Sequence, residues 1–128
     1  MEIVVDASCI MAVLTEEPER AQVIARTEGV RLVSPGCLPY EIENALSALV
    51  KRGRIDAETA VAAYREFKRL PIRLVEPDGE TAVRIATAEK QYAYDAYYLV
   101  CAQTMGIPLY SLDNGLLHVA KKRGIQCW

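Results

Sequence analysis

The sequence is short of the residues that most zinc and redox sites use. Its 128 residues include one histidine, and its four cysteines show no CxxC spacing, so we expect no zinc site built from cysteine and histidine. Each cysteine lies among apolar neighbours and is expected to be a small buried hydrophobic residue in a reducing compartment. These cysteines are Cys9, Cys37, Cys101 and Cys127.

Other absences narrow the class of protein further. No apolar run approaches the roughly 20 residues that cross a bilayer, and no basic flank with an apolar stretch opens the chain, so we expect a cytoplasmic protein without a membrane partner. The formal net charge of −2 does not indicate nucleic-acid binding, although a basic face can accompany an acidic pocket. Neither GxGxxG nor GxxxxGK(S/T) occurs, which excludes these glycine-rich phosphate loops.

What the sequence does contain is an alternation of strand and helix patterns. We expect strands at 31–33, 72–75 and 107–112, a first strand ending at Asp6 and a last edge strand at 125–128. We expect helices at 8–14, 18–26, 56–69, 78–90 and 94–105, one ending at 51–54, and a short last one closed by Gly124. The helix that ends at 51–54 carries an apolar stripe of helical period: Ile42, Ala45, Leu46, Leu49 and Val50. The alternation predicts a single three-layer α/β domain over residues 1–128, with a parallel sheet between helices.

The N-terminal segment is the one around which the rest of the chain is organised. An apolar β-branched run ends at Asp6, and Ala7 and Ser8 follow directly. This pattern predicts a buried strand that presents Asp6 at its carboxyl end, where ligands bind in open α/β sheets. An aspartate in this place is also a common helix cap, whose carboxylate accepts a backbone N–H. The segment alone leaves both interpretations open.

Three further carboxylates fall where this topology brings acids together. Asp113 also ends a strand, and Asp95 lies in the first turn of an inner helix, where burial without a partner would be costly. At the start of the stripe-bearing helix, Glu41 and Glu43 flank the stripe on opposite sides, and periodicity does not choose between them. We favour Glu41 because it lies nearer the helix start and hence nearer the carboxyl edge of the sheet.

Several carboxylates in one pocket repel each other and need protons or cations. Mg²⁺ takes oxygen ligands and binds phosphate oxygens, and such ions activate water and stabilise a leaving oxygen. The acids therefore indicate a Mg²⁺- or Mn²⁺-dependent phosphodiesterase, with simple helix capping as the open alternative.

Two other classes of acid-based site fit the sequence less well. A haloacid-dehalogenase-like phosphatase would carry a second aspartate where this chain has Ser8. A receiver domain would have an acidic pair near the N-terminus and a phosphoacceptor aspartate at the end of its third strand. Neither Val5-Asp6 nor 72–75 supplies these residues.

Four segments in order resemble the PIN-domain ribonucleases, and more narrowly the VapC-type toxins of toxin–antitoxin pairs. They are Val4-Val5-Asp6-Ala7-Ser8, Glu41-Ile42-Glu43-Asn44-Ala45-Leu46, Tyr94-Asp95-Ala96-Tyr97-Tyr98-Leu99 and Leu109-Tyr110-Ser111-Leu112-Asp113. The match runs from Ile3 to Gly124. It implies a Rossmann-like α/β/α sandwich with a parallel sheet of about five strands.

The resemblance also implies an activity and its residues. Asp6, Glu41, Asp95 and Asp113 would form the acidic quartet of a Mg²⁺- or Mn²⁺-dependent endoribonuclease. Asp6, Asp95 and Asp113 would hold the metal, Glu41 would orient or help to deprotonate the attacking water, and Ser8 and Asn44 would lie beside the site or the substrate. The implied partners are RNA, a small antitoxin whose tail fills the acidic pocket, and a second copy of the chain. The alternative is a catalytically weak PIN-fold protein that acts as a binding partner or scaffold.

Some polar and aromatic residues are assigned a structural role. The family often has a basic residue after its last aspartate, where this chain has Asn114. We expect the basic groups at 51–54, 68–69 and 121–123 to be helix ends or solvated faces, and His118 to be exposed and not catalytic. The tyrosines at 92, 94, 97 and 98 are expected to pack in the core and in a dimer contact.

Overall fold

The computed structural model describes residues 1–128 and contains one sheet of four parallel strands. The strand order is β3-β2-β1-β4. The strands are β1 (Glu2–Val5), β2 (Arg31–Pro35), β3 (Ile72–Val75) and β4 (Leu109–Tyr110). Because all four strands run the same way, their carboxyl ends meet at one edge of the sheet, as the sequence predicts.

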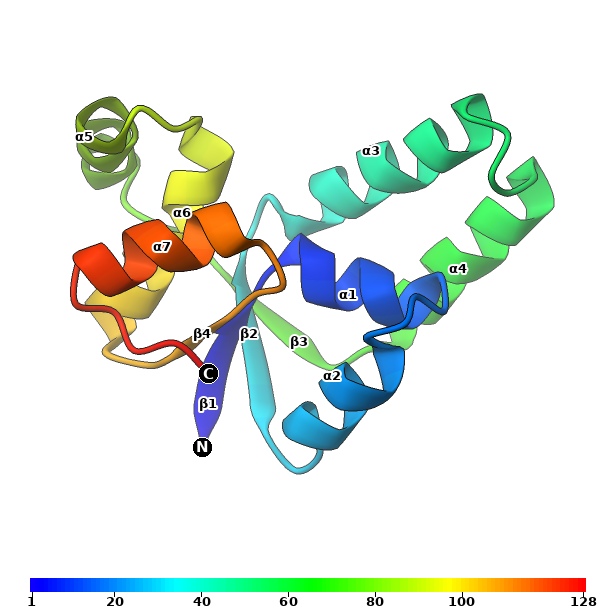
Figure 1. Ribbon diagram of the computed structural model, residues 1–128, viewed down its shortest axis with the longest axis horizontal. Coiled ribbons are helices and arrows are strands. Elements are labelled where there is room, and N and C mark those ends of the chain that lie inside the picture. Colours follow the sequence, from blue (N-terminus) through cyan, green and yellow to red (C-terminus); the bar gives the residue numbers. More distant parts are fainter.

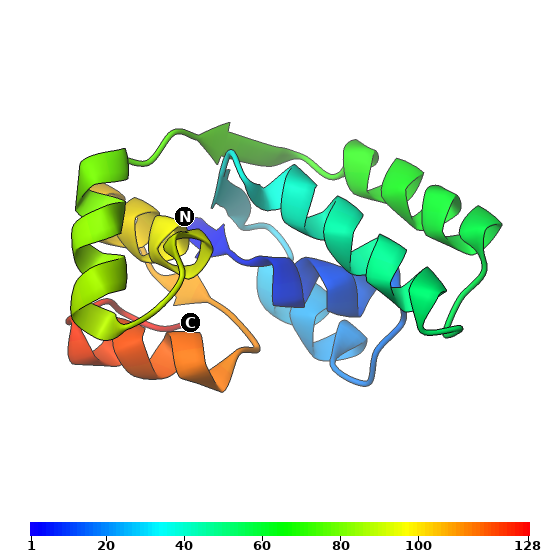
Figure 2. The same ribbon diagram turned by 90° about the horizontal axis from the view of Figure 1, so that it is seen from above.

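Seven helices form the two outer layers. Four lie on one side of the sheet and three on the other, as Figure 1 and Figure 2 show. The first group is α1 (Ala7–Leu14), α2 (Arg20–Thr27), α3 (Leu38–Lys51) and α4 (Ala57–Arg69). The second group is α5 (Gly79–Glu89), α6 (Ala93–Met105) and α7 (Asn114–Lys122). The predicted α/β/α sandwich is confirmed.

The central strand β1 divides the core between the two layers. Val4 packs with the buried residues of α5, α6 and α7, whereas Ile3 and Val5 pack with those of α1 to α4. Successive side chains of a strand point to opposite faces. A strand that is apolar on both faces is therefore the signature of a sheet covered on both sides.

Helix ends follow the local signals in the sequence. The stripe-bearing helix α3 ends at Lys51, and Gly53 follows with a φ of +71°. Helix α6, expected to be an inner helix, is buried along most of its length and ends at Gly106, which has a φ of +65°. Left-handed backbone of this kind is tolerated by glycine without steric cost.

Two predicted strands are shorter than expected. Strand β4 covers only Leu109–Tyr110 of the predicted 107–112, and 125–128 contributes a single parallel bridge, between Leu109 and Cys127, in place of a fifth strand. Pro108 lacks a backbone N–H, and Ser8 Oγ accepts the backbone N–H of Leu112 at 2.9 Å. Neither Pro108 nor Leu112 therefore donates a backbone N–H to the ladder, although the Pro108 carbonyl still accepts the Val4 N–H at 2.8 Å.

Some predicted burial is corrected by the structure. Tyr98 is buried, at 2% exposure, but Tyr92 and Tyr94 are not core residues in this chain and are 84% and 56% exposed. Cys9 and Cys101 are buried, whereas Cys37 and Cys127 are only half-buried, and all four thiols are free. His118 is exposed on α7, as expected. None of the helices combines the length and apolar character needed to cross a membrane.

Candidate active site

Asp6 lies at the carboxyl end of the central strand and is 5% exposed. Its Oδ1 atom accepts hydrogen bonds from Ser8 Oγ at 2.6 Å and from the backbone N–H of Cys9 at 3.3 Å. Its Oδ2 atom accepts one from Ser111 Oγ at 2.5 Å. Asp6 is thus the N-cap of α1 and also a buried carboxylate held between β1 and the segment after β4.

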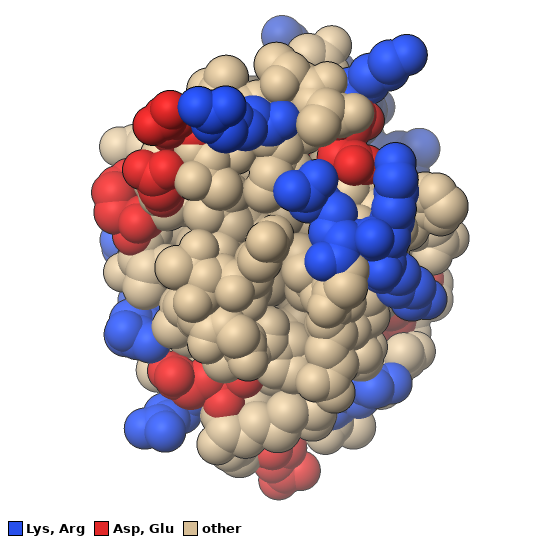
Figure 3. All heavy atoms as spheres, turned by 90° about the vertical axis from the view of Figure 1, so that its left-hand side faces the viewer, with Lys and Arg blue, Asp and Glu red and all other residues tan.

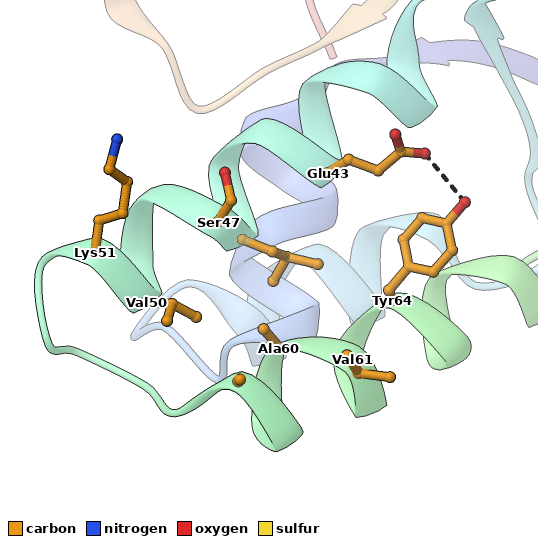
Figure 4. Close-up of a pocket in the computed structure, with 9 residues that line it drawn as sticks. Glu43, Ser47, Val50, Lys51, Ala60, Val61 and Tyr64 are labelled. Atoms are coloured by element: carbon orange, nitrogen blue, oxygen red, sulfur yellow. Dashed lines mark hydrogen bonds between the residues drawn. The ribbon is translucent and has the colours of Figure 1, made fainter.

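Glu41 lies on α3, and its side chain is hydrogen-bonded to a residue of α6. Its Oε2 atom accepts a hydrogen bond of 2.7 Å from the buried hydroxyl of Tyr98, and its Oε1 atom accepts one of 3.8 Å from Cys37 Sγ. Glu43 points elsewhere, because its Oε2 atom accepts a hydrogen bond of 3.1 Å from Tyr64 of α4 (Figure 4). The structure therefore places Glu41, and not Glu43, on the side of α3 that meets α6.

Asp95 and Asp113 come from two other elements. Asp95 is half-buried in the first turn of α6, and its side chain accepts no hydrogen bond. Asp113 is exposed at the start of α7, where its Oδ1 atom accepts from the backbone N–H groups of Gly115 at 2.9 Å and Leu116 at 3.2 Å. Figure 1 shows the N-terminal ends of α1, α3 and α7 gathered above the carboxyl edge of the sheet.

Three of the four acids have a raised pKa, and the charges of neighbouring acids contribute to each shift. Burial raises the pKa of Asp6 most, and the charge of Asp113 raises it further against the three hydrogen bonds that lower it. Burial also raises the pKa of Glu41, where Asp95 and Asp6 add to the effect and the Tyr98 hydroxyl opposes it. The pKa of Asp95 is raised by burial, then by Asp113 and Asp6. These shifts are the expected result of like charges that share a poorly solvated site.

The chemistry of this donor set suits a hard divalent cation. No salt bridge joins any of the four carboxylates to a Lys or Arg side chain, so their negative charge lacks a counter-ion from the chain. Oxygen ligands and uncompensated charge are what Mg²⁺ and Mn²⁺ require. As the side chains stand, however, no three His, Cys, Asp or Glu residues are grouped closely enough to hold an ion. Asp6 Oδ2 accepts a single hydrogen bond and so keeps a lone pair for an ion, and coordination would need the neighbouring acids to turn inward.

The family is decided by a comparison of sequences. The PIN domain family matches residues 3–122 of this chain. The chain belongs to the PIN domain family. The match covers all four acids, and the resemblance drawn from the four segments is confirmed. No curated protein matches the sequence significantly.

Solved structures share this PIN fold. PAE2754 from Pyrobaculum aerophilum is 25% identical with a TM-score of 0.73, over 93% of this chain and 86% of that one. VapC20 from Mycobacterium tuberculosis, described as a Sarcin-Ricin loop cleaving toxin, is 17% identical with a TM-score of 0.64, over 91% and 93%. VapBC2 from Rickettsia felis, bound to a DNA fragment from their promoter, is 7% identical with a TM-score of 0.71, over 100% and 98%. At these low identities, the last two likenesses concern the fold.

Two residues in this PIN domain support the acids without having been predicted to do so. Ser111 binds Asp6, and its Oγ atom also accepts the backbone N–H of Asp113 at 2.9 Å, so it connects two of the acids. Tyr98 was expected only to pack, yet its hydroxyl holds Glu41. The signal for Ser111 is its place two residues before Asp113, which resembles the place of Ser8 two residues after Asp6.

Ser8 and Asn44, both predicted to lie beside the site or the substrate, have different positions relative to the acids. Ser8 contacts Asp6 and the backbone of Leu112, so it lies in the cluster. Asn44 is exposed on α3, and no hydrogen bond joins its side chain to any of the four acids. The structure therefore does not bring Asn44 into the cluster.

The surface of the molecule is uneven in charge and polarity. An apolar groove of about 500 Å³ lies between α3 and α4 and is lined by residues that include Leu46, Val50 and Val61 (Figure 4). On the side of α5, α6 and α7, Lys and Arg side chains gather on one part of the face (Figure 3). Two of this side's cations, Lys122 and Arg123, are paired with Glu89 at 3.2 and 3.4 Å. This pairing fits the interpretation of 121–123 as a helix end.

Proposed function

We propose that this chain, as a single PIN domain over residues 1–128, is a Mg²⁺- or Mn²⁺-dependent endoribonuclease. The single observation that carries the proposal is the set of acids Asp6, Glu41, Asp95 and Asp113, which come from four different elements and form no salt bridge with a Lys or Arg side chain. Burial, and then neighbouring carboxylates, raise the pKa values of Asp6, Glu41 and Asp95. Such a site favours either protonation or a bound cation, and a phosphodiester substrate brings further negative charge that a cation neutralises.

Each acid has a distinct role in this proposal. Asp6, Asp95 and Asp113 would hold the metal, which supplies Lewis-acid activation of water and charge stabilisation at the leaving oxygen. Glu41, held by Tyr98, would orient the attacking water and accept its proton. Ser8 and Ser111 keep the Asp6 carboxylate fixed at the sheet edge. Hydrolysis would displace the 3′ oxygen of the RNA phosphodiester.

We also propose that the protein is the toxin of a type II toxin–antitoxin pair in the cytoplasm. The proposal is supported by likeness of fold to VapC20, described as a cleaving toxin, and to VapBC2. The expected partners are RNA, a small antitoxin whose tail enters the acidic pocket, and a second copy of the chain in a homodimer.

A second candidate function is a binding or scaffold protein with a weak or absent nuclease activity. Two observations favour it. Both Asp6 oxygens are already engaged by donors from the chain, and the apolar groove between α3 and α4 suits a partner helix. An open reading frame for a small basic-tailed protein directly upstream would favour the toxin over this alternative.

The direct test is a cleavage assay with a paired variant. Purified protein and Asp6→Asn, prepared in parallel, are incubated with structured RNA in Mg²⁺, in Mn²⁺ and in chelator. We expect cleavage that requires metal and is absent in Asp6→Asn. Equal cleavage by both proteins would indicate a contaminating ribonuclease, and no cleavage by either folded, metal-binding protein would favour the binding function.

A further inference from the structure

A cleft of about 620 Å³ opens next to the acids, between the start of α3, the β3–α5 connection and the first turns of α6. Its lining includes Cys37, Tyr40, Glu76, Tyr94 and Tyr97. Its lining combines a carboxylate with three tyrosines, whereas the groove between α3 and α4 is lined mainly by aliphatic side chains. No part of the proposed reaction uses this cleft.

The cleft and the acid cluster share neighbouring residues. Cys37 lines the cleft and donates to Glu41 of the cluster. Tyr94 directly precedes Asp95, and Tyr97 directly precedes Tyr98, the residue that holds Glu41. A polymer with its reacting bond at the acids would therefore have an adjoining unit within reach of this cleft.

Two tyrosines give the cleft exposed aromatic faces. Tyr40 is 70% exposed, and Tyr94 is 56% exposed although its ring is fixed. Tyr97 holds it in an edge-to-face contact, with ring centroids 6.0 Å apart and an interplanar angle of 82°. A ring that is held in place and still open to solvent loses little conformational freedom when another flat ring stacks on it.

The charge of the lining selects which part of a nucleotide can enter. Glu76 is the only charged residue that lines the cleft, and no Lys or Arg is present there. A phosphate would be repelled by its carboxylate, whereas an amino group of a base can donate to it, as cytosine N4 does to acidic side chains. Stacking on tyrosine with a carboxylate at the edge is the chemistry of base recognition in single strands.

We propose that this cleft binds one unpaired base of an RNA strand whose backbone lies at the acids. The base stacks against Tyr94 and Tyr40, and Glu76 accepts a hydrogen bond from its amino group. The inference rests on the proposed nuclease function for the position of the strand, and it names a base-binding subsite of that same site. Bases with an exocyclic amino group bind better than uracil, which has none.

The test is the binding of fluorescein-labelled single-stranded RNA hexamers by the full chain, followed by fluorescence anisotropy. Ca²⁺ replaces Mg²⁺ so that the acids are neutralised by an oxygen-seeking cation. The variants are Tyr94→Ala, Tyr40→Ala, Tyr94→Phe and Glu76→Gln. Tyr92→Ala is the matched control, because Tyr92 is even more exposed than Tyr94 but does not line the cleft.

We expect each alanine variant in the cleft to bind about 5- to 150-fold more weakly, the effect of losing one base–aromatic stack. Tyr94→Phe and Tyr92→Ala should bind within twofold of the parent, and Glu76→Gln should reduce the preference for oligo(A) and oligo(C) over oligo(U). Equal binding by Tyr94→Ala, Tyr92→Ala and the parent would overturn the inference. So would a change of oligomeric state in Tyr94→Ala with RNA binding unaltered, which would assign the cleft to a contact between copies.

Cleavage by the same proteins, measured in Mg²⁺, separates this inference from the proposed function. Cleavage with no tyrosine dependence of binding would leave the nuclease and remove the subsite. Tyrosine-dependent binding without cleavage would keep the subsite and remove the nuclease.

Discussion

Four aspartates in this molecule cap a helix in the same way, yet burial raises the pKa of Asp6, whereas the pKa values of Asp56 and Asp78 are lowered. Asp6, Asp56, Asp78 and Asp113 are the N-caps of α1, α4, α5 and α7, and each side chain accepts a backbone N–H from the first turn. Hydrogen bonds from the Thr59 hydroxyl and backbone lower the pKa of Asp56, and those of Thr81 lower the pKa of Asp78. The pKa of Asp6 is raised by burial, despite its own three hydrogen bonds.

The difference lies in what surrounds the cap. Asp56 and Asp78 are exposed to water on the outer layers, whereas Asp6 is buried at the sheet edge near Asp95 and Asp113. Capping and chemistry are therefore not alternatives at Asp6, because the same carboxylate caps a helix and belongs to an acid cluster. Substitution by asparagine or alanine separates the charge of these residues from their capping bond.

The largest expected effect is the loss of cleavage in Asp113→Asn. Asparagine caps a helix about as well as aspartate, so α7 should remain intact while the charge is lost. We expect cleavage to fall by about 100-fold or more, since metal stabilisation of the transition state is worth several kcal/mol. Turnover in Mg²⁺ and thermal unfolding are measured together, with Asp56→Asn as the matched control. Equal loss in Asp56→Asn would show that the effect comes from the fold.

Removing the Tyr98 hydroxyl should shift the pH dependence of cleavage. The hydrogen bond from Tyr98 lowers the pKa of Glu41 against the effect of burial, so Tyr98→Phe should raise that pKa further. A base must be ionised to accept a proton, so the rising limb of the pH–rate profile should move to higher pH. At pH values below the rising limb, we expect the rate of cleavage to fall roughly tenfold, as for other residues that orient a catalytic group. An unchanged limb would remove Glu41 from the role of base.

Divalent metal should raise the Tm of the protein by binding at the acid cluster, and the exposed helix caps should make no difference to this rise. A metal ion that binds only the native state adds about 2.7 kcal/mol to the free energy of unfolding when the free metal concentration is 100 times the dissociation constant. Differential scanning fluorimetry across a Mg²⁺ or Mn²⁺ series should show this rise in Tm for the parent and for Asp78→Asn. It should be absent in Asp6→Asn, and an equal rise in that variant would place the ion elsewhere.

Truncating an exposed cap should affect stability alone. Asp56→Ala removes the hydrogen bond of 2.7 Å to the backbone N–H of Thr59, and we expect Tm to fall by roughly 2–8 °C, the usual cost of a lost N-cap. Thermal unfolding followed by circular dichroism gives the shift. The rate of RNA cleavage at 25 °C should stay within twofold of the parent, and a larger loss would mean that α4 contributes to the site.

The smallest expected effect is a gain in stability for Asp95→Asn as pH rises. The raised pKa of Asp95 means that the folded protein keeps the proton more strongly than the unfolded chain, whose pKa is close to 3.8. Wild-type stability therefore falls as pH rises from that value through the folded pKa. Urea unfolding at several pH values should show no difference at low pH and a more stable variant at neutral pH. A variant that is less stable at neutral pH would mean that the charge of Asp95 is compensated.

Much of the fold follows from local signals. The stripe of α3, the cap at Asp56 and the glycine that ends α6 each act within one or two turns of the chain, so the sequence is sufficient to predict them. The prediction of a fifth strand at 125–128 was wrong, because its formation depends on a strand elsewhere in the chain. Whether Ile125–Trp128 pairs as a strand depends on how much of β4 remains available, and β4 is only two residues long.

The candidate site was likewise predictable from the sequence only in part. The positions of Asp6 and Asp113 at strand ends follow from the sequence, because parallel strands bring their carboxyl ends to one edge. The partners of those acids do not. Ser111 and Tyr98 lie 105 and 57 residues from the carboxylates that they bind, and no periodicity within a single element predicts such a contact.

The sequence by itself determined which helices and which of the four sheet strands form, where most of them end and which strand ends carry acids, since these depend on short-range backbone and side-chain preferences. Only the tertiary structure decided that Glu41 and not Glu43 faces α6, that Asn44 has no bond to the acids, and that Tyr94 is exposed in a cleft. Those outcomes depend on how α3, α5 and α6 pack across the sheet, because packing sets the burial and the neighbouring charges of each side chain.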